Sequence, residues 1–412
     1  MWRPYTDELA IVVRASHAGS QLALSLREHG WTGRVLLLGD EQQLPYHRPP
    51  LSKAFLKGSS SVEDLRIRPA ATYGDQEIEL LLGHRVVAAD VDSQVLELSD
   101  GRELQYTKLG LATGAVPRKL SIPGSDKTGI HYLRSLDDAL NIGSELAADK
   151  RAVIVGGGYI GLELAASLRT MGLNVTVLEA MDRLLQRVTG PEVSEFFKRI
   201  HSDNGVSVET TAAVVGFDGG DSVDSVLLED GRSVPADLVV VGIGVVPETS
   251  LAAQLDLKVD DGILVDEYAM TSNRHIAAAG DCTRHPNHLL GQQLRLESVP
   301  NAQEQAKSAA ASLCGKQVEY CQLPWFWSDQ YELKLQMAGI NRGYDEVIMR
   351  GDHHNSTSFS AFYCKQGELI AVDCVNRPQE FMLTRRALSQ ESPVDVARLS
   401  DESISPRDLF IA

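Results

Sequence analysis

The sequence predicts an α/β protein made of two similar doubly wound domains and a smaller α+β domain. A short apolar run, a turn, a helical pattern and a second apolar run occur in the same order at 10–38 and 152–178. After residue 320 the pattern changes to short strand-like runs followed by a helical tail. A chain of 412 residues is too long for one compact core, so several domains are expected.

The first copy begins with the apolar run 10–13, which a turn and a helical pattern through His29 follow. The next apolar run, 35–38, predicts a second parallel strand beside the first. Further on, the run 95–98 leads through an Asp-Gly turn to the run 109–114. An Asp-Gly pair between strand-like runs is a strong hairpin signal, so a hairpin is expected here.

The second copy repeats this plan with a glycine cluster after the first run and a helical pattern that extends to Met171. Its second apolar run is 175–178, and the run 226–228 precedes another Asp-Gly turn and the buried run 238–241. One unit has therefore been used twice. A duplicated dinucleotide-binding unit most simply holds two dinucleotides, and a bound flavin beside a diffusing nicotinamide is the pairing known in chemistry.

The last part of the chain predicts a mixed domain, with strand-like runs at 359–364 and 369–374 and a helix over 378–388. No low-complexity linker separates the parts, so we expect them to pack closely. The predicted division is a discontinuous FAD-binding domain over 1–114 and 245–320, an NAD-binding domain over 115–244, and a C-terminal α+β domain over 321–412.

Composition and charge exclude several classes of function. With 43% hydrophobic and 23% charged residues, the chain has the composition of a soluble globular protein. A net charge of −17 argues against nucleic acid or an anionic membrane as the main partner. No apolar stretch reaches eighteen residues, and Met1 to Leu9 lack the order of a secretory signal, so a cytoplasmic location is expected. The five cysteines form no Cys-x-x-Cys pair and no metal-ligand spacing, which predicts reduced thiols and no metal site.

The firmest motif is a nicotinamide-binding turn in the second copy. Gly156, Gly158 and Gly161 fit G-x-G-x-x-G between a strand and a helix. The first glycine permits the tight turn, the second lets the pyrophosphate approach the backbone, and the third lets the helix pack on the strand. The helix that Tyr159 and Ile160 begin should point its N-terminus at the phosphates.

Glu179, at the end of the second strand of this copy, is the acid expected for this motif. A carboxylate there can accept hydrogen bonds from both ribose hydroxyls and would repel a 2′-phosphate, so NADH is preferred over NADPH. Arg183 lies nearby in the sequence and could tolerate the phosphate, which leaves the strictness of this preference open.

Six further segments carry a resemblance to a known family. They are PYHRPPLSK at 45–53, ATG at 112–114, GGGYIGLE at 156–163, AGDC at 279–282, ESVPNA at 297–302 and PWFWSDQ at 324–330. With these motifs the chain resembles the FAD-dependent NADH:ferredoxin reductases of bacterial oxygenase and cytochrome P450 systems. The similarity covers nearly the whole chain and implies a glutathione-reductase-like fold.

The resemblance also implies residue roles. It implies that Asp40 meets the adenosine ribose of FAD, Asp281 its ribitol chain and Val299 its isoalloxazine. Lys53 would lie near the flavin ring, and Glu163 would approach Lys53 and the nicotinamide, which makes these two the candidate catalytic residues. An ammonium near the flavin edge stabilises charge on the reduced ring. The full set of implied FAD contacts is Ala18, Gly19, Asp40, Lys53, Val86, Arg134, Asp281, Val299 and Trp327.

One part of the chain departs from the family pattern. Arg14 and Ser16 occupy the first two glycine positions of the first copy, and only the third glycine, Gly19, is present. A strained backbone position costs about 1–3 kcal/mol, enough to weaken cofactor binding roughly tenfold to a hundredfold. A guanidinium beside the pyrophosphate could offset part of this cost. We expect FAD to be held by the remaining contacts; the alternative is a fold with low FAD occupancy.

The function that follows is an NADH-dependent flavoprotein oxidoreductase that passes single electrons to a [2Fe–2S] ferredoxin, as a monomer or homodimer. The lack of a cysteine pair argues against the disulfide reductases, which need thiols beside the flavin. Relatives that reduce rubredoxin or oxygen remain alternatives, because one core serves several acceptors. A redox-sensing or scaffold protein that binds NADH but holds little FAD is the other alternative, supported only by Arg14 and Ser16.

Overall fold

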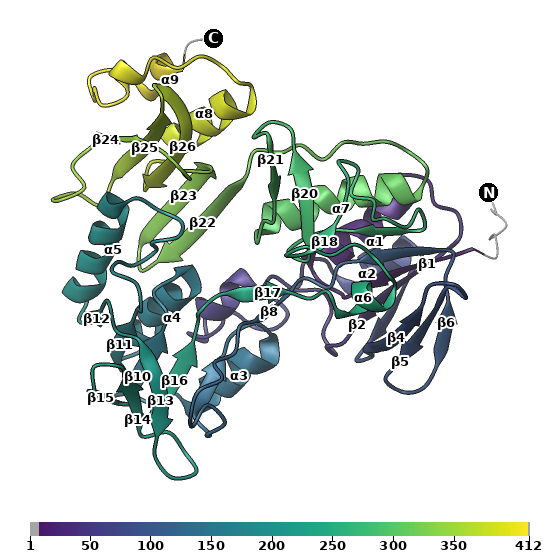
Figure 1. The fold of residues 1–412 in the computed structure, drawn as a ribbon, viewed down its shortest axis with the longest axis horizontal. Coiled ribbons are helices and arrows are strands. Elements are labelled where there is room, and N and C mark those ends of the chain that lie inside the picture. The colour runs from purple at the N-terminus through teal and green to yellow at the C-terminus, as the bar shows by residue number, and fades with distance from the viewer. Residues whose placement is uncertain (1–7, 411–412) are drawn as a thin grey trace. The chain divides into compact units, whose positions relative to one another are not determined.

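The computed structural model describes residues 8–410, which form two compact units (Figure 1). The sequence segments that make up the first unit are 8–47, Glu63–Val116 and Val246–Pro324, and those of the second are Arg48–Val62, Pro117–Val245 and 325–410. The first unit is discontinuous, as expected for the first copy. The second copy and the C-terminal part form one unit, which also takes in Arg48–Val62. The division into three domains stays a prediction.

The first unit is built on a parallel sheet with the strand order β19-β7-β1-β2-β3. Its strands are β1 (Leu9–Val13), β2 (Arg34–Gly39), β3 (Ile78–Leu82), β7 (Lys108–Leu111) and β19 (Ile276–Ala278). Residues of β1 alternate between two cores: Ala10 and Val12 face one, Ile11 and Val13 the other. Because the chain leaves β1 on one side and returns as β7 on the other, the switch point of the sheet lies between these strands.

Helices cover one face of this sheet and a small antiparallel sheet covers the other. The helices are α1 (His17–Glu28), α2 (Ala70–Asp75) and α7 (Val299–Leu313), and the strands of the small sheet are β4 (Val86–Asp90), β5 (Val95–Leu98) and β6 (Glu103–Gln105). Leu22 of α1 and Ala306 of α7 belong to the core that contains Val12, whereas Leu96 of β5 belongs to the core that contains Ile11.

The second unit repeats this architecture with the parallel order β12-β11-β10-β16-β9. Its strands are β9 (Ile130–Tyr132), β10 (Arg151–Val155), β11 (Asn174–Leu178), β12 (Ser207–Glu209) and β16 (Leu238–Val241). The helices are α3 (Leu136–Glu145), α4 (Tyr159–Thr170) and α5 (Pro191–Asp203), and the small antiparallel sheet consists of β13 (Val214–Asp218), β14 (Ser225–Leu228) and β15 (Ser233–Pro235). The predicted duplication is confirmed, because β1 and β10 each span five residues and α1 and α4 each span twelve.

The predicted hairpins exist, but their second strands differ from those expected. The strands that follow the two Asp-Gly turns are β6 and β15, each only three residues long. The apolar runs β7 and β16 instead join the parallel sheets. A strand of three residues is too short to show a clear alternation of polar and apolar side chains. Sequence periodicity therefore does not detect such strands.

The C-terminal part forms an antiparallel sheet in the order β22-β23-β26-β25-β24. Its elements are β22 (Trp325–Gln330), β23 (Leu333–Gly339), β24 (Glu346–Arg350), β25 (Phe359–Lys365), β26 (Glu368–Val375) and α8 (Pro378–Ser389). Phe359 and Tyr363 of β25 belong to the same buried core as Phe196 of α5 and Leu162 of α4. The fold class predicted from the sequence is therefore confirmed.

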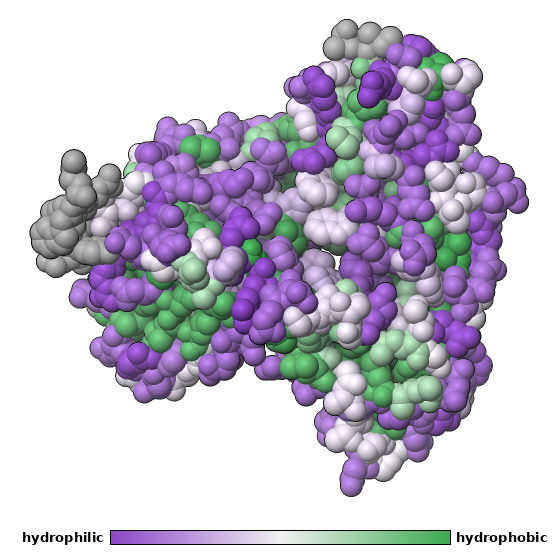
Figure 2. Space-filling model, turned by 180° about the vertical axis from the view of Figure 1, so that it is seen from behind, coloured by the Kyte–Doolittle hydropathy of each residue, from purple (hydrophilic) through white to green (hydrophobic). Residues whose placement is uncertain are grey.

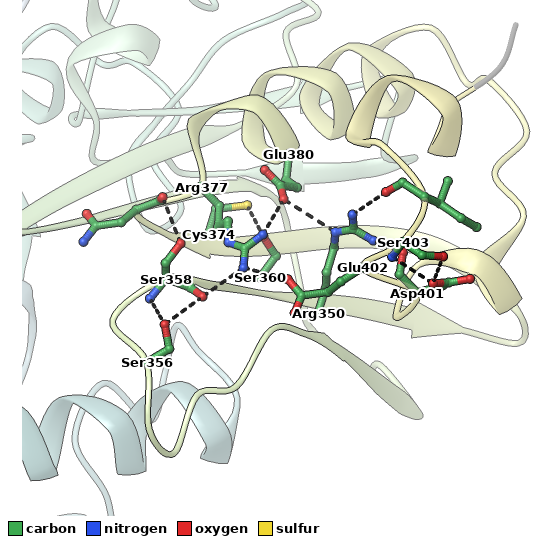
Figure 3. Close-up of polar contacts among 12 residues, drawn as sticks. Arg350, Ser356, Ser358, Ser360, Cys374, Arg377, Glu380, Asp401, Glu402 and Ser403 are labelled. Atoms are coloured by element: carbon green, nitrogen blue, oxygen red, sulfur yellow. Dashed lines mark hydrogen bonds and ion pairs between the residues drawn. The ribbon is translucent and has the colours of Figure 1, made fainter.

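A buried arginine ties the end of the chain to this sheet (Figure 3). Arg350 donates to the carbonyl oxygens of Leu399 at 3.3 Å, Asp401 at 2.6 Å and Ile404 at 2.7 Å. Its Nε lies 3.5 Å from the buried carboxylate of Glu380. One charged side chain thus satisfies three backbone acceptors of a segment with little secondary structure.

The remaining elements are short. They are η1 (Pro49–Ser52), β8 (Ala115–Pro117), β17 (Val245–Pro247), α6 (Ser250–Gln254), β18 (Ile263–Leu264), β20 (Thr283–Asn287), β21 (Gln292–Leu294), η2 (Val396–Arg398) and α9 (Pro406–Leu409). Among residues 8–410 no helix is long and apolar enough to cross a bilayer, and no cluster of metal-ligating side chains occurs. Figure 2 shows a largely hydrophilic surface with hydrophobic residues in separate patches.

Candidate functional site

The glycine turn of the second copy has the geometry that G-x-G-x-x-G requires. Gly156 has φ +110°, and a Cβ there would come within 2.4 Å of the Gly242 carbonyl oxygen. A Cβ on Gly161 would come within 2.2 Å of the Gly156 oxygen. Gly158 precedes α4 without a side-chain cap, and nothing lies within 4 Å of a Cβ built on it. The turn before α4 is therefore tightly packed at Gly156 and Gly161, whereas the space beside Gly158 is open.

Tyr159 and Ile160, the first residues of α4, point in different directions. The Tyr159 ring packs against Phe326 with centroids 4.9 Å apart, and its hydroxyl lies 2.6 Å from the Met337 sulfur. Burial raises the pKa of this phenol well above its ordinary value. Ile160 is 43% exposed. These positions leave the backbone, rather than the side chains, to meet a phosphate.

Glu179 lies beside the glycine turn. Its carboxylate accepts the Gly157 amide at 2.7 Å and the Met181 amide at 2.8 Å, which fixes its orientation. Arg183 is engaged elsewhere, because its guanidinium donates to the Thr189 carbonyl at 2.8 Å and the Ser194 hydroxyl at 2.6 Å. The structure therefore places the carboxylate at the turn and holds the guanidinium within its own loop.

The first copy has the same turn with different residues. Arg14 corresponds to Gly156 and adopts φ +84°, a value that side chains rarely tolerate. Its Nη1 donates to the carbonyl oxygen of Thr113, two residues after β7, at 2.5 Å. A Cβ on Gly19 would come within 2.0 Å of the Arg14 oxygen. The first copy thus retains the turn and the third glycine, and its strained backbone conformation lies at Arg14.

Ser16 corresponds to Gly158 and caps α1. Its Oγ accepts the Gly19 amide at 3.3 Å, and its own amide donates to the Arg14 oxygen at 2.9 Å. This is an ordinary N-cap, which satisfies one of the donors that a helix start leaves open. The start of α1 is therefore capped by its own side chain, whereas the start of α4 is not.

The other residues implied for FAD in the first unit converge on the start of α1. Gly280 precedes Asp281 and has φ +91°, and a Cβ there would come within 3.2 Å of the Ala18 side chain and 3.7 Å of the Ala302 side chain. The half-buried Val299 is the first residue of α7. Asp281, Ala18 and Val299 are thus brought to one end of the sheet by close packing at Gly280.

A buried amide beside this segment has an unsatisfied donor. Gln305 Oε1 accepts the Gly280 amide and the Thr283 hydroxyl, both at 2.8 Å. Its Nε2 is buried and has no hydrogen-bond partner among the described residues. Polar groups gather at these strand ends: the starts of α1 and α7, the Asp281 carboxylate and the unsatisfied Gln305 amide. Such a polar setting fits a dinucleotide.

Asp40 and Val86 lie at the ends of strands of this unit. Asp40 directly follows β2, the neighbour of β1, and is exposed. The half-buried Val86 begins β4 and packs against the core that contains Leu96. The exposed carboxylate is free to meet a ribose, whereas the Val86 side chain is partly used in packing.

The two candidate catalytic residues meet in the second unit. Lys53 Nζ lies 3.0 Å from Glu163 Oε1 and 3.5 Å from Asp329 Oδ2. Glu163 is only 6% exposed and also accepts the hydroxyls of Ser52 at 2.7 Å and Ser328 at 2.8 Å. Sequence reasoning missed Ser52, Ser328 and Asp329, although all three lie within motifs that it quoted.

Local structure explains how Lys53 and Glu163 reach each other. The two prolines of η1 begin a tight 3₁₀ turn, and Lys53 is its C-cap. The Ser52 carbonyl accepts the Ser167 hydroxyl at 2.7 Å, which ties this turn to α4 one helical turn beyond Glu163. The proline turn thus presents Ser52 and Lys53 to the same face of α4.

Arg134 and Trp327 also belong to the second unit. The Arg134 carbonyl accepts a short hydrogen bond from Arg48, and its amide donates to Asp138 at 3.0 Å at the start of α3. Trp327 on β22 has its ring 5.6 Å from that of Trp325. Arg134 is thus tied to the start of α3, and Trp327 belongs to the aromatic segment of β22.

A histidine pair lies beside the first turn, and it was not predicted from the sequence. His17, the first residue of α1, has its Nε2 3.1 Å from His47 Nδ1. Burial, together with the charge of Arg68, lowers the pKa of His47. A neutral His47 can then share one hydrogen bond with His17.

Comparison with known proteins decides the family. Residues 10–306 match the pyridine nucleotide-disulphide oxidoreductase family. The chain belongs to this family. Residues 325–410 match the C-terminal domain of reductases, which accounts for the sheet from β22 to β26.

Individual relatives agree with this assignment. The chain is 43% identical to putidaredoxin reductase CamA of Pseudomonas putida over 98% of this chain and 97% of that protein. It is 42% identical to rhodocoxin reductase of Rhodococcus erythropolis over 95% of this chain and 92% of that protein. The crystal structure of the covalent putidaredoxin reductase–putidaredoxin complex matches with a TM-score of 0.94 and 43% identity, covering 98% of each chain.

The glutathione-reductase-like fold predicted from the sequence is therefore confirmed, with two dinucleotide-binding halves and a C-terminal domain. The protein is an oxidoreductase, and the cofactors of its family are FAD and NAD(H).

Proposed function

We propose that this protein is an NADH:ferredoxin reductase that supplies single electrons to a [2Fe–2S] ferredoxin serving a cytochrome P450 or Rieske oxygenase. When bound, FAD takes two electrons from NADH and releases them one at a time. Within the family, we choose a reductase of an external acceptor over a disulfide reductase because residues 8–410 contain no disulfide. All five cysteines are free, and three of them are buried. Without paired thiols, an internal disulfide cannot take the electrons, so an external acceptor is proposed.

NADH is proposed to bind at the start of α4. The backbone at Gly158, Tyr159 and Ile160 meets the pyrophosphate, because the helix start carries no side-chain cap. Gly156 and Gly161 shape the turn. Glu179 accepts hydrogen bonds from the ribose hydroxyls and disfavours a 2′-phosphate, while Arg183 stays within its own loop.

The proposed FAD contacts are those implied by the family motifs. In the first unit Asp40 binds the adenosine ribose, Asp281 the ribitol chain and the backbone of Val299 the isoalloxazine. The proposed contacts are completed by Ala18, Gly19, Val86, Arg134 and Trp327. Arg14 offers a guanidinium at the pyrophosphate turn, which offsets part of the cost of its strained backbone.

Lys53 and Glu163 are proposed as the catalytic residues. The Lys53 ammonium would stabilise negative charge on a bound flavin, and Glu163 holds the ammonium in place. Both side chains are mostly shielded from solvent, so their interaction is stronger than that of a surface ion pair.

The acceptor and the organisation of the protein are further proposals. A reductase of rubredoxin or oxygen is the second candidate, because the same core serves several acceptors. A redox-sensing or scaffold protein with little FAD is the third, supported by Arg14 and Ser16 at glycine positions. A cytoplasmic monomer or homodimer with three domains remains our expectation.

The test begins with the visible spectrum of the purified protein before and after added FAD, followed by anaerobic NADH. Flavin bands that bleach with NADH support the reductase, and a protein that FAD cannot colour supports the redox-sensing alternative. Cytochrome c reduction is then measured with a [2Fe–2S] ferredoxin, with rubredoxin and with neither. No acceleration by ferredoxin would overturn the main proposal, and acceleration by rubredoxin alone would favour the second.

A further inference from the structure

A chain of buried polar side chains leads away from Glu163. Ser328 Oγ donates to Glu163 Oε1 at 2.8 Å, and Gln330 Nε2 donates to Ser328 Oγ at 3.2 Å. Gln330 Oε1 lies 2.9 Å from His201 Nε2, and the Tyr331 hydroxyl lies 3.4 Å from His201 Nδ1. Five residues from three elements and one turn thus form one continuous path.

The fold puts these side chains in the interior for a definite reason. Ser328 and Gln330 alternate along β22, so the pleat turns both to the same face, where they are 0% and 1% exposed. Glu163 comes from α4 and His201 from α5, and His201 is fully buried. Buried polar groups of this kind are costly unless each has a partner, and here each has one.

The chemistry of the groups fixes the direction of every hydrogen bond. As the partner of the Lys53 ammonium, the Glu163 carboxylate can only accept, so Ser328 must donate its single proton to it. The Ser328 oxygen therefore accepts from the amide nitrogen of Gln330. The Gln330 oxygen in turn accepts from His201, which must carry its proton on Nε2 and leave Nδ1 to accept.

The state of His201 agrees with this direction. Burial lowers the pKa of its imidazole, which is therefore neutral at ordinary pH and has one donor and one acceptor nitrogen. The groups with which it shares a hydrogen bond are Gln330 and the Tyr331 hydroxyl, both uncharged. Only the tautomer protonated on Nε2 can donate to Gln330 and accept from the Tyr331 hydroxyl.

The carboxylate at the end of the path has no freedom to rotate. Its Oε1 accepts from Lys53 and Ser328, and its Oε2 accepts from Ser52. Lys53 is in turn held between this carboxylate and that of Asp329. A donor lost anywhere along the path would loosen the position of the Lys53 ammonium.

We propose that Ser328, Gln330 and His201 are positioning residues for Lys53, which act by holding the Glu163 carboxylate in one orientation. The proposal rests on the proposed function, in which Lys53 would stabilise charge on a bound flavin. It adds to the reaction two residues of the motif at 324–330, Ser328 and Gln330, together with His201 of α5. It also states that His201 carries its proton on Nε2 in the working enzyme.

The test uses the FAD-loaded enzyme with Ser328→Ala and Gln330→Met. The matched control is Ser360→Ala, because Ser360 is also fully buried in the same sheet but donates to the Cys374 sulfur. We expect the first two variants to slow flavin bleaching at saturating NADH about tenfold and to shift the flavin midpoint potential. FAD content and the dissociation constant for NADH should stay unchanged, and the control should match the wild type.

A double-mutant cycle with Lys53→Met separates positioning from loss of packing. If Ser328 acts through Lys53, then Ser328→Ala has no further effect on the rate or the potential in the Lys53→Met background. Independent, additive effects would overturn the proposal. If Lys53→Met alone changes neither quantity, the proposed role of Lys53 is wrong and the positioning role falls with it.

Nitrogen-15 spectra of the histidines give a readout that does not depend on turnover. His201→Gln assigns the His201 signals. We expect the wild type to show the Nε2-protonated tautomer and Gln330→Met to show a mixture of tautomers. An Nδ1-protonated imidazole in the wild type would contradict the direction of the path.

Discussion

The hydroxyl of Tyr363 donates a hydrogen bond of 2.6 Å to the buried carboxyl of Asp373 and accepts the Gly190 amide at 2.8 Å. Gly190 precedes α5, and Leu185 of the same loop donates its amide to the Gly157 carbonyl. A titrating group on the C-terminal sheet is thus linked through one tyrosine to the loop that packs against the glycine turn before α4.

Replacing Asp373 with Asn should remove a pH dependence of stability. Burial raises the pKa of Asp373 to about 7. Between pH 4 and 7 the folded state then binds more protons than the unfolded state, so stability falls as pH rises through this window. The loss amounts to roughly 4 kcal/mol at most. Urea unfolding at several pH values measures it, with the exposed Asp126→Asn as the control. An unchanged slope in Asp373→Asn would contradict the assignment.

His285 should contribute a slope of the opposite sign over nearly the same pH range. Its ring nitrogens are buried without a partner among the described residues, and burial lowers the pKa to about 4. Between pH 6.5 and 4 the unfolded state binds more protons, so stability is lost as pH falls, by roughly 3 kcal/mol. In His285→Phe this acid-side slope should vanish, because the ring contact with Tyr320 is kept without the titrating group. Exposed His288→Phe should keep it.

Restoring glycine in the first turn should tighten FAD binding. Arg14 sits at φ +84° and Ser16 caps the helix start where a phosphate would approach. Relief of about 1–3 kcal/mol of strain predicts a dissociation constant lower by roughly tenfold to a hundredfold in Arg14→Gly/Ser16→Gly. Titration of the apoprotein with FAD, followed by flavin fluorescence, measures it. The single variants separate strain from capping. Weaker binding in Arg14→Gly would instead show that the guanidinium holds the pyrophosphate.

Glu179 should set the preference for NADH. In Glu179→Gln the negative charge is lost, while an oxygen remains to accept the Gly157 amide. The ratio of kcat/KM for NADH to that for NADPH should fall about tenfold. Arg183→Gln is the companion variant, and its ratio should not change because the guanidinium is engaged by Thr189 and Ser194. A larger change in Arg183→Gln than in Glu179→Gln would reverse the assignment.

Glu380 should be needed to keep Arg350 buried. Its carboxylate lies 3.5 Å from Arg350 and 3.1 Å from Arg377, and its side chain is 4% exposed (Figure 3). Glu380→Ala leaves a buried charge without its partner, which should cost roughly 3–5 kcal/mol of unfolding free energy. Glu402→Ala removes the other, half-exposed partner of Arg377 and should cost less than about 1 kcal/mol. Equal losses in the two variants would contradict this explanation.

The sequence by itself determined the repeated architecture and the turn geometry. Apolar periodicity is local, so it predicted β1, α1 and their counterparts β10 and α4 at nearly their observed bounds. Hard-sphere sterics are local as well, and they predicted a strained backbone at Arg14, where the structure has φ +84°. Glu179 could also be placed beside the glycine turn from the sequence, because strand ends in a parallel sheet meet at one edge.

Only the tertiary structure decided how the Lys53–Glu163 pair is supported. Glu163 draws its partners from positions 111 and 165 residues away, Ser52 and Ser328, and no local pattern relates them. The same is true of the path to His201, which needs a strand and a helix packed in register. Side-chain contacts across such separations depend on how elements pack, and packing is a property of the whole unit. The residues proposed to carry the chemistry were therefore visible in the sequence, whereas the contacts that hold them in place were not.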